Sequence, residues 1–354
     1  MTPTPYAKLP DMAFWRRGIA SVPTEDVDPV GTFGLKIDRG TKVATAGSCF
    51  AQHIARHLNT SGYNHLIAEP GHPILPESVR TENGYGLFSC RYGNIYTARQ
   101  LLQLFERAYG RFVPGEDLWF NGEAVVDPFR PRVQRGGFIS EAEMRRDREQ
   151  HLAAVRRMFE TLDVLVFTLG LTESWRSRGD GAVFPLCPGV DGGEFDPDRH
   201  EFYNQPFEEV ISDLTDFWAA IRSLNPRAQL VLTVSPVPLV ATAQPGEHVL
   251  SATTYSKSVL RVAAEVIRHR FDDVHYFPAF EIVTGNYSRG RYYAADLRNV
   301  VEPGVEHVMR TFMRHATDGL VASGHTASPA ISDYLELGEQ LVEVECDEVA
   351  LDRG

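Results

Sequence analysis

Cysteine is scarce in this chain, with four among 354 residues. Cys49, Cys90, Cys187 and Cys346 lie far apart, and none belongs to a Cys-x-x-Cys pair. This spacing argues against a zinc knuckle and a thioredoxin-like redox pair, and it predicts reduced thiols. The sequence also lacks a His-Glu-x-x-His motif and a Gly-x-x-x-x-Gly-Lys phosphate loop. We therefore expect no metal and no nucleotide cofactor.

Positive charge is in deficit, because 35 Lys and Arg stand against 47 Asp and Glu, for a net charge of -12. A nucleic-acid partner requires clustered basic residues, so none is expected. No apolar run approaches the ~18 residues of a membrane span, and residues 1–8 lack the apolar core of a signal peptide. We expect a cytoplasmic protein without a membrane span.

Apolar runs that are typical of doubly buried strands alternate with helical patterns. The predicted strands cover 42–47, 163–170, 229–236 and 274–278, with a weaker one at 66–68. The predicted helices cover 50–60, 97–109, 140–160, 207–224, 254–270 and 304–317. Strands that alternate with helices predict an α/β fold, a three-layer α/β/α sandwich with a central parallel sheet.

One elaborated domain is favoured, because the chain shows no internal repeat and no linker. Residues 1–38 form an N-terminal extension packed on the core, and residues 39–330 form the domain itself. Two Gly-, Pro- and Asp-rich segments, 111–139 and 176–206, are predicted to be loop excursions. Residues 331–354 are strongly acidic and predict a solvated helix followed by a frayed tail.

Ser48 stands where the first predicted strand passes through Gly47 into a helix. The carboxyl edge of a parallel sheet is where ligands bind, and the first turn of a helix presents free N–H groups and a positive dipole end. Ser48 is therefore placed like a nucleophile. The simpler alternative is a serine that caps an ordinary helix. Cys49 is a second possible nucleophile, because a helix N-terminus stabilises a thiolate, although a packing role is favoured.

The block Gly47-Ser48-Cys49-Phe50-Ala51 resembles the motif that names the GSCFA family. Further blocks agree in order along the chain: 88–96, 167–170, 233–238, 256–260 and 292–296. The chain is thus identified as a member of that family, which resembles the SGNH, or GDSL-type, esterases. The resemblance implies a serine nucleophile, here Ser48, and an Asp-x-x-His pair near the C-terminus.

Two positions depart from the esterase pattern. Asn299 follows Asp296 where the resemblance implies the catalytic histidine, and an asparagine cannot take a proton from serine near neutral pH. Thr172 stands where the resemblance implies an asparagine that holds the oxyanion, and it offers one hydroxyl proton instead of an amide. A hydrolase therefore needs its base from elsewhere.

Two histidines are candidate bases. His248 lies on the loop after the 229–236 strand, at the edge where catalytic loops gather, and His307 lies on the helix after Asp296. Asp296 would orient whichever histidine acts. The oxyanion would be held by donors at Ser48, Cys49, Gly170 and Thr172, with Gly93 and Asn94 as further candidates. Glu173 is predicted to orient a histidine or a sugar hydroxyl, or else to pair with a nearby arginine.

The leading prediction is a serine esterase or O-acyltransferase that acts on an acylated carbohydrate or a related small ester through an acyl-serine. The alternative is a carbohydrate-binding or assembly protein that keeps the esterase scaffold without turnover. The acyl group, the sugar, the acceptor and the oligomeric state are left open.

Overall fold

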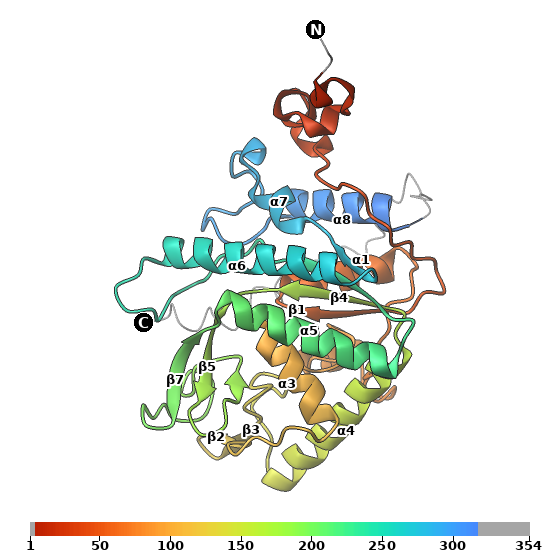
Figure 1. Cartoon of the computed structure of the whole chain (residues 1–354). Helices are drawn as coiled ribbons and strands as arrows, with labels where there is room; N and C mark the ends of the chain where they lie inside the picture. The colour runs from red at the N-terminus through yellow and green to blue at the C-terminus, as the bar shows by residue number, and fades with distance from the viewer. Residues whose placement is uncertain (1–3, 318–354) are drawn as a thin grey trace.

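A computed structural model describes residues 4–317 of the chain. Its centre is a four-stranded parallel sheet in the order β1-β4-β8-β9 (Figure 1). The strands are β1 (Val43–Gly47), β4 (Val164–Leu169), β8 (Gln229–Val234) and β9 (Val274–Tyr276). Their apolar runs are buried because helices cover both faces, as parallel sheets require. The predicted three-layer α/β/α class is confirmed.

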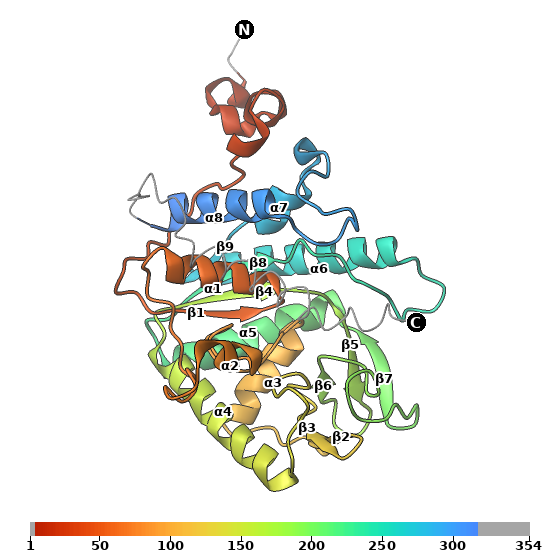
Figure 2. The same cartoon turned by 180° about the vertical axis from the view of Figure 1, so that it is seen from behind.

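Alternate residues of β4 enter two different cores. Leu165, Phe167 and Leu169 point into one core, while Val164 and Val166 point into the other. The first core is closed by α3 (Ala98–Ala108), α4 (Glu141–Thr161), α5 (Phe207–Leu224) and α6 (Val249–Arg270). The second is closed by α1 (Phe50–Thr60), α7 (Ala279–Thr284) and α8 (Glu302–Ala316). Figure 2 shows α1 and α8 on one side of the sheet and α3, α4 and α5 on the other.

The predicted strand at 66–68 is wrong. The chain touches β1 at a single bridge between Val43 and His65, and the Leu66 N–H then donates to the Val43 carbonyl. Ala68 already donates to the Ser89 carbonyl, so this segment leaves β1 before a strand can form.

Short antiparallel strands that were not predicted lie in the two predicted loop excursions, and one of them, at Glu173–Ser177, begins just before the second excursion. One sheet pairs β2 (Trp119–Asn121) with β3 (Ala124–Val126). The other has the order β6-β5-β7 and consists of β5 (Glu173–Ser177), β6 (Val183–Phe184) and β7 (His200–Asn204). Trp119 and Phe184 pack in one small core and join the two sheets. Helix α2 (Glu77–Glu82) lies between α1 and α3 in the chain.

Residues 5–26 form four short helical turns without a buried residue, at Pro5–Lys8, Asp11–Ala13, Arg16–Ala20 and Thr24–Asp26. They stand off the sheet and its helices in both views (Figures 1 and 2). The following segment packs on the core through Val30, Leu35 and Ile37. A turn at Asn286–Ser288 follows α7. The predicted acidic tail at 331–354 lies outside the described residues. None of the helices in residues 4–317 is long and apolar enough to cross a membrane.

Candidate active site around Ser48

The turn between β1 and α1 places Ser48 at the carboxyl edge of the sheet. Gly47 has a φ of 135°, and a Cβ atom there would lie 2.4 Å from the Thr168 carbonyl oxygen. This close approach explains the glycine, because side chains rarely adopt that backbone conformation. Cys49 is the N-cap residue of α1, so Ser48 lies immediately outside the helix.

The Ser48 hydroxyl is buried without a partner. The residue is 3% exposed, and Ser48 Oγ makes no hydrogen bond to any described residue. Ser48 lines a small cavity, and of the predicted site residues Cys49 and Gly170 also line it. The remaining lining residues are Tyr96, Leu171, Ser235, Val237, Pro238 and Arg298. A buried polar atom that lacks a partner beside a cavity can form a hydrogen bond with a ligand or a water molecule.

Arg298 was missed from the sequence, although it lies beside Ser48 in this cavity. Its Nε donates to the Pro238 carbonyl at 3.2 Å, which fixes the guanidinium against the loop after β8. The signal was present, because Arg298 stands between Asp296 and Asn299 in the block expected to carry the catalytic pair. Tyr96 was also missed. Its carbonyl accepts hydrogen bonds from the Gly170 and Leu171 N–H groups at 2.9 and 3.1 Å.

His307 does not face the Ser48 cavity, and its contacts are those of a structural residue. Its Nδ1 accepts from the Tyr292 hydroxyl at 2.7 Å, and its Nε2 donates to the Val27 carbonyl at 2.8 Å. Burial lowers the pKa of this imidazole. Both ring nitrogens are therefore occupied, which leaves neither to accept a proton from Ser48, and His307 does not fit the role of base.

His248 caps the N-terminus of α6, which begins five residues earlier than predicted. The exposed imidazole accepts from the Leu250 N–H through Nδ1 at 3.1 Å, and its Nε2 makes no hydrogen bond to the described residues. His248 does not line the cavity. The next residue, Val249, does pack against Tyr96 and Leu171, both of which form cavity wall. His248 thus stands one residue from the packing that surrounds Ser48.

Asp296 contacts asparagine where the resemblance implies histidine. Its Oδ2 accepts from the Asn299 side-chain amide at 2.7 Å, and its Oδ1 accepts from the Arg298 and Asn299 N–H groups at 3.0 Å. The carboxylate shapes the turn that carries Arg298. The described contacts of Asp296 include no histidine, so Asp296 does not orient a histidine in this structure as predicted.

Three of the predicted oxyanion donors are used within the fold. The Ser48 N–H donates to the Thr168 carbonyl at 3.2 Å, and the Gly170 N–H donates to Tyr96. Thr172 donates its N–H to Ser256 Oγ at 2.9 Å and its hydroxyl to Asn204 at 2.7 Å. These groups cannot also receive an oxyanion without breaking buried hydrogen bonds. Arg298 is the one cationic side chain among the lining residues.

Gly93 and Asn94 lie next to the Ser48 turn but line a different cavity. The following Ile95 N–H donates to the Gly47 carbonyl at 2.8 Å, and Tyr96 then returns to the Ser48 cavity. Glu173 begins β5 and accepts from the Thr242 hydroxyl at 2.8 Å, without lining the Ser48 cavity. Within residues 4–317 no group of three or more His, Cys, Asp and Glu could hold a metal ion.

The profile of the GSCFA family matches residues 42–312, which contain all of the elements that surround Ser48. The chain belongs to the GSCFA family. No curated protein is detectably similar to it. In this GSCFA protein, the block at 47–51 that gives the family its name forms the turn that places Ser48 in the wall of the cavity.

Proposed function

We propose that this GSCFA protein is a serine esterase or O-acyltransferase that forms an acyl-serine at Ser48, with an acylated carbohydrate or a related small ester as substrate. The observation that carries the proposal is the Ser48 hydroxyl, which is buried without a hydrogen-bond partner among the described residues, in a residue that lines a cavity at the carboxyl edge of the sheet. A hydroxyl that served merely as a helix cap would be bonded to the first turn of α1, and none of that helix's N–H groups uses it.

The lining of the cavity combines apolar and polar groups. Leu171, Val237 and Pro238 supply apolar surface, while Ser235 and Arg298 supply a hydroxyl and a guanidinium. A carbonyl beside Ser48 would place its oxygen among polar groups, with its alkyl part against the apolar wall. The guanidinium of Arg298 would stabilise the charge that develops on that oxygen, in place of the amides that the fold has used.

His248 is our candidate base. Ser48 Oγ would bond to the acyl carbon while its proton passes to the imidazole, which then protonates the departing alcohol. The cap bond from Leu250 to Nδ1 keeps the neutral ring protonated on Nε2. The cap must therefore break, or the ring must turn, before His248 can accept the proton. The loop 236–248 would have to carry the imidazole to Ser48.

The test is covalent labelling with a fluorophosphonate probe, followed by ester hydrolysis assays on the intact protein. Ser48→Ala should abolish labelling and lower the rate at least ~10³-fold. His248→Gln should slow labelling strongly, whereas His269→Gln, which changes an exposed histidine at the far end of α6, should not. Cys49→Ser should keep activity. Hydrolysis that survives in Ser48→Ala but is lost on iodoacetamide treatment would move the chemistry to Cys49.

A second candidate is a carbohydrate-binding or assembly protein without turnover. It is favoured by the donors of Gly170 and Thr172, which are bonded within the fold, and by the pairing of Asp296 with Asn299. This candidate expects no fluorophosphonate labelling between neutral and alkaline pH. It also expects an acetylated sugar to bind with similar affinity to the wild type and to Ser48→Ala, and more weakly to Arg298→Gln.

A further inference from the structure

Two adjoining cavities are lined by residues of the 92–95 segment, which follows Arg91 and leads to Tyr96 of the Ser48 cavity. The two cavities share Tyr92, Asn94, Phe129, Arg130 and Pro185 in their walls. Gln52, in the first turn of α1, lines the larger one. The cavities therefore begin behind the same turn that carries Ser48, yet they have their own lining.

Arginine side chains line both cavities. Arg91, Arg130 and Arg132 line the larger, and Arg107, Arg130 and His151 line the smaller. Among residues 4–317, neither lining includes an aspartate or a glutamate. Because the whole protein has a net charge of -12, its average composition does not explain a cavity wall that is rich in arginine.

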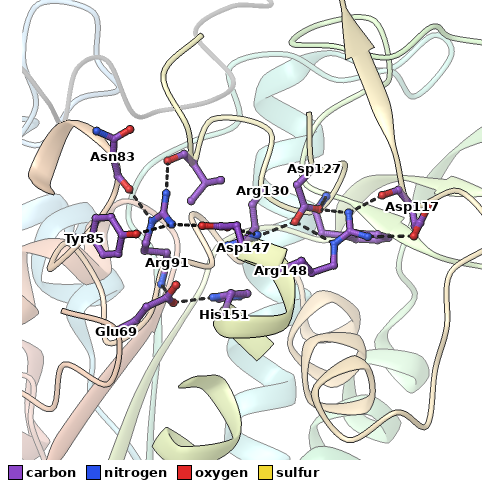
Figure 3. A network of polar contacts seen from close by, with 12 residues as sticks. Glu69, Asn83, Tyr85, Arg91, Asp117, Asp127, Arg130, Asp147, Arg148 and His151 are labelled. Atoms are coloured by element: carbon purple, nitrogen blue, oxygen red, sulfur yellow. Dashed lines mark hydrogen bonds and ion pairs between the residues drawn. The ribbon is translucent and has the colours of Figure 1, made fainter. Parts of the chain in front are cut away.

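The carboxylates that hold these arginines stand behind the cavity wall. Figure 3 shows a row in which arginines alternate with aspartates: Arg91, Asp147, Arg130, Asp127, Arg148 and Asp117. Asp127 is fully buried, and the neighbouring arginines hold its pKa far below the usual range in spite of that burial. The row fixes the guanidinium groups in place before any ligand arrives.

One buried donor and one buried ring nitrogen in this wall have no hydrogen-bond partner among the described residues. Arg130, 3% exposed, gives Nε to Asp127 at 3.0 Å and Nη2 to Asp147 at 2.8 Å, while Nη1 has no hydrogen bond within the described residues. His151, 1% exposed, uses Nδ1 on Glu69 at 2.8 Å, while Nε2 has none. Both residues line the smaller cavity. The Nδ1–H of His151 donates to the Glu69 carboxylate and burial lowers the pKa of the ring, so Nε2 is an acceptor. The unpaired Arg130 donor is costly to bury, which points to a group that accepts from it.

Arg107 adds a cation to the same cavity. Its guanidinium lies 3.8 Å from the centre of the Phe129 ring and makes no hydrogen bond or ion pair with the described residues. Burial lowers the pKa of this arginine to about 9, against the attraction of Asp127. Arg107 thus remains charged at neutral pH, and the described residues use none of its fork of donors.

We propose that these cavities form a second site, which binds the oxyanion group of a small organic acid of sugar size, either a carboxylate or a phosphate ester. Arg130 Nη1 and the Arg107 fork would donate to the oxygens, a geometry that guanidinium groups match well. Leu87, Phe88 and Phe129 would contact the carbon skeleton. This proposal goes beyond the acyl chemistry at Ser48 and does not depend on it.

The test is isothermal titration of the whole protein with glucuronate, glucose 6-phosphate and glucose. Either anion, or both, should bind saturably at one site, and the better of the two identifies the preferred oxyanion, whereas neutral glucose should not bind. Arg107→Gln should weaken anion binding at least ~10-fold, because a charge-assisted contact is lost. Arg227→Gln removes the same charge from an exposed position before β8, at the opposite edge of the sheet, and should leave binding unchanged.

Arg107→Gln breaks no ion pair with the described residues, so its fold should survive, and Arg132→Gln provides a second, partly exposed variant. Ser48→Ala should bind the anion as the wild type does, so a failure of the acyl chemistry leaves this result intact. Equal binding of glucose and glucuronate, no binding of either anion at millimolar concentration, or binding unchanged in both arginine variants would overturn the proposal.

Discussion

At the scale of the residue, Gly47 fixes the position of Ser48. We predict that Gly47→Ala destabilises the protein by at least ~3 kcal/mol, because a Cβ would collide with the Thr168 backbone at a φ that suits glycine alone. Gly62→Ala is the matched control. Gly62 also has a positive φ, 74°, but open space surrounds it, so we expect a loss of ~1 kcal/mol. Urea unfolding measures both, and equal losses would contradict a steric role for Gly47.

The sequence was enough to predict the position of Ser48, but it was not enough to predict which residues surround it. Gly47 and Ser48 are set by a local turn, which a strand followed by an amphipathic helix reveals. His307 bonds to Val27, 280 positions away, and Thr172 bonds to Asn204. Such polar pairings depend on how distant segments meet, and no local pattern encodes them. Arg298 was not predicted for the same reason, because its place in the site depends on its contact with the distant loop after β8.

At the scale of the element, the long strands and helices were predictable because each buries a regular stripe of apolar residues. The antiparallel strands β5, β6 and β7 were not, because they are short, partly exposed and lie in polar, glycine-rich segments. The start of α6 was also misplaced. His248 caps it from outside the apolar pattern, and histidine is not among the usual capping residues.

The N-terminus of α3 is the element that holds the Tyr96 wall of the Ser48 cavity. Gln100 accepts from the Tyr96 and Thr97 N–H groups at 2.8 and 3.0 Å, and Thr97 caps Gln100 in return. We predict that Gln100→Ala lowers the free energy of unfolding by ~1 kcal/mol and also weakens fluorophosphonate labelling of Ser48. Ser140→Ala removes the cap of α4, away from the cavity. It should cost similar stability in urea unfolding without changing labelling, and a parallel loss of labelling would contradict the link through Tyr96.

At the scale of the whole molecule, a buried histidine beside the sheet makes stability depend on pH. His65 lies beside β1 and is 6% exposed, with Nε2 on the Thr45 hydroxyl at 3.0 Å and Nδ1 on the Asn59 amide at 3.2 Å. Burial lowers the pKa of His65 to about 4. In the unfolded chain an unperturbed histidine has a pKa near ~6.5. At a pH between these two pKa values, the unfolded chain binds a proton on this ring and the folded protein does not.

The resulting stability is complete above pH ~6.5 and is lost as the pH falls toward 4, because the unfolded state binds more protons across that window. We predict that His65 alone lowers the free energy of unfolding by roughly 2 kcal/mol between pH 7.5 and pH 5. This figure follows from the difference between the folded and unfolded pKa values, at ~1.4 kcal/mol per pKa unit. His65→Gln keeps polar contacts without titrating, so its urea midpoints at these two pH values should differ less than those of the wild type. His269→Gln, at an exposed histidine of α6, should keep the wild-type difference. An identical slope in His65→Gln and the wild type would show that the ring is protonated in the folded protein, and that its burial does not set the acid sensitivity of the sheet.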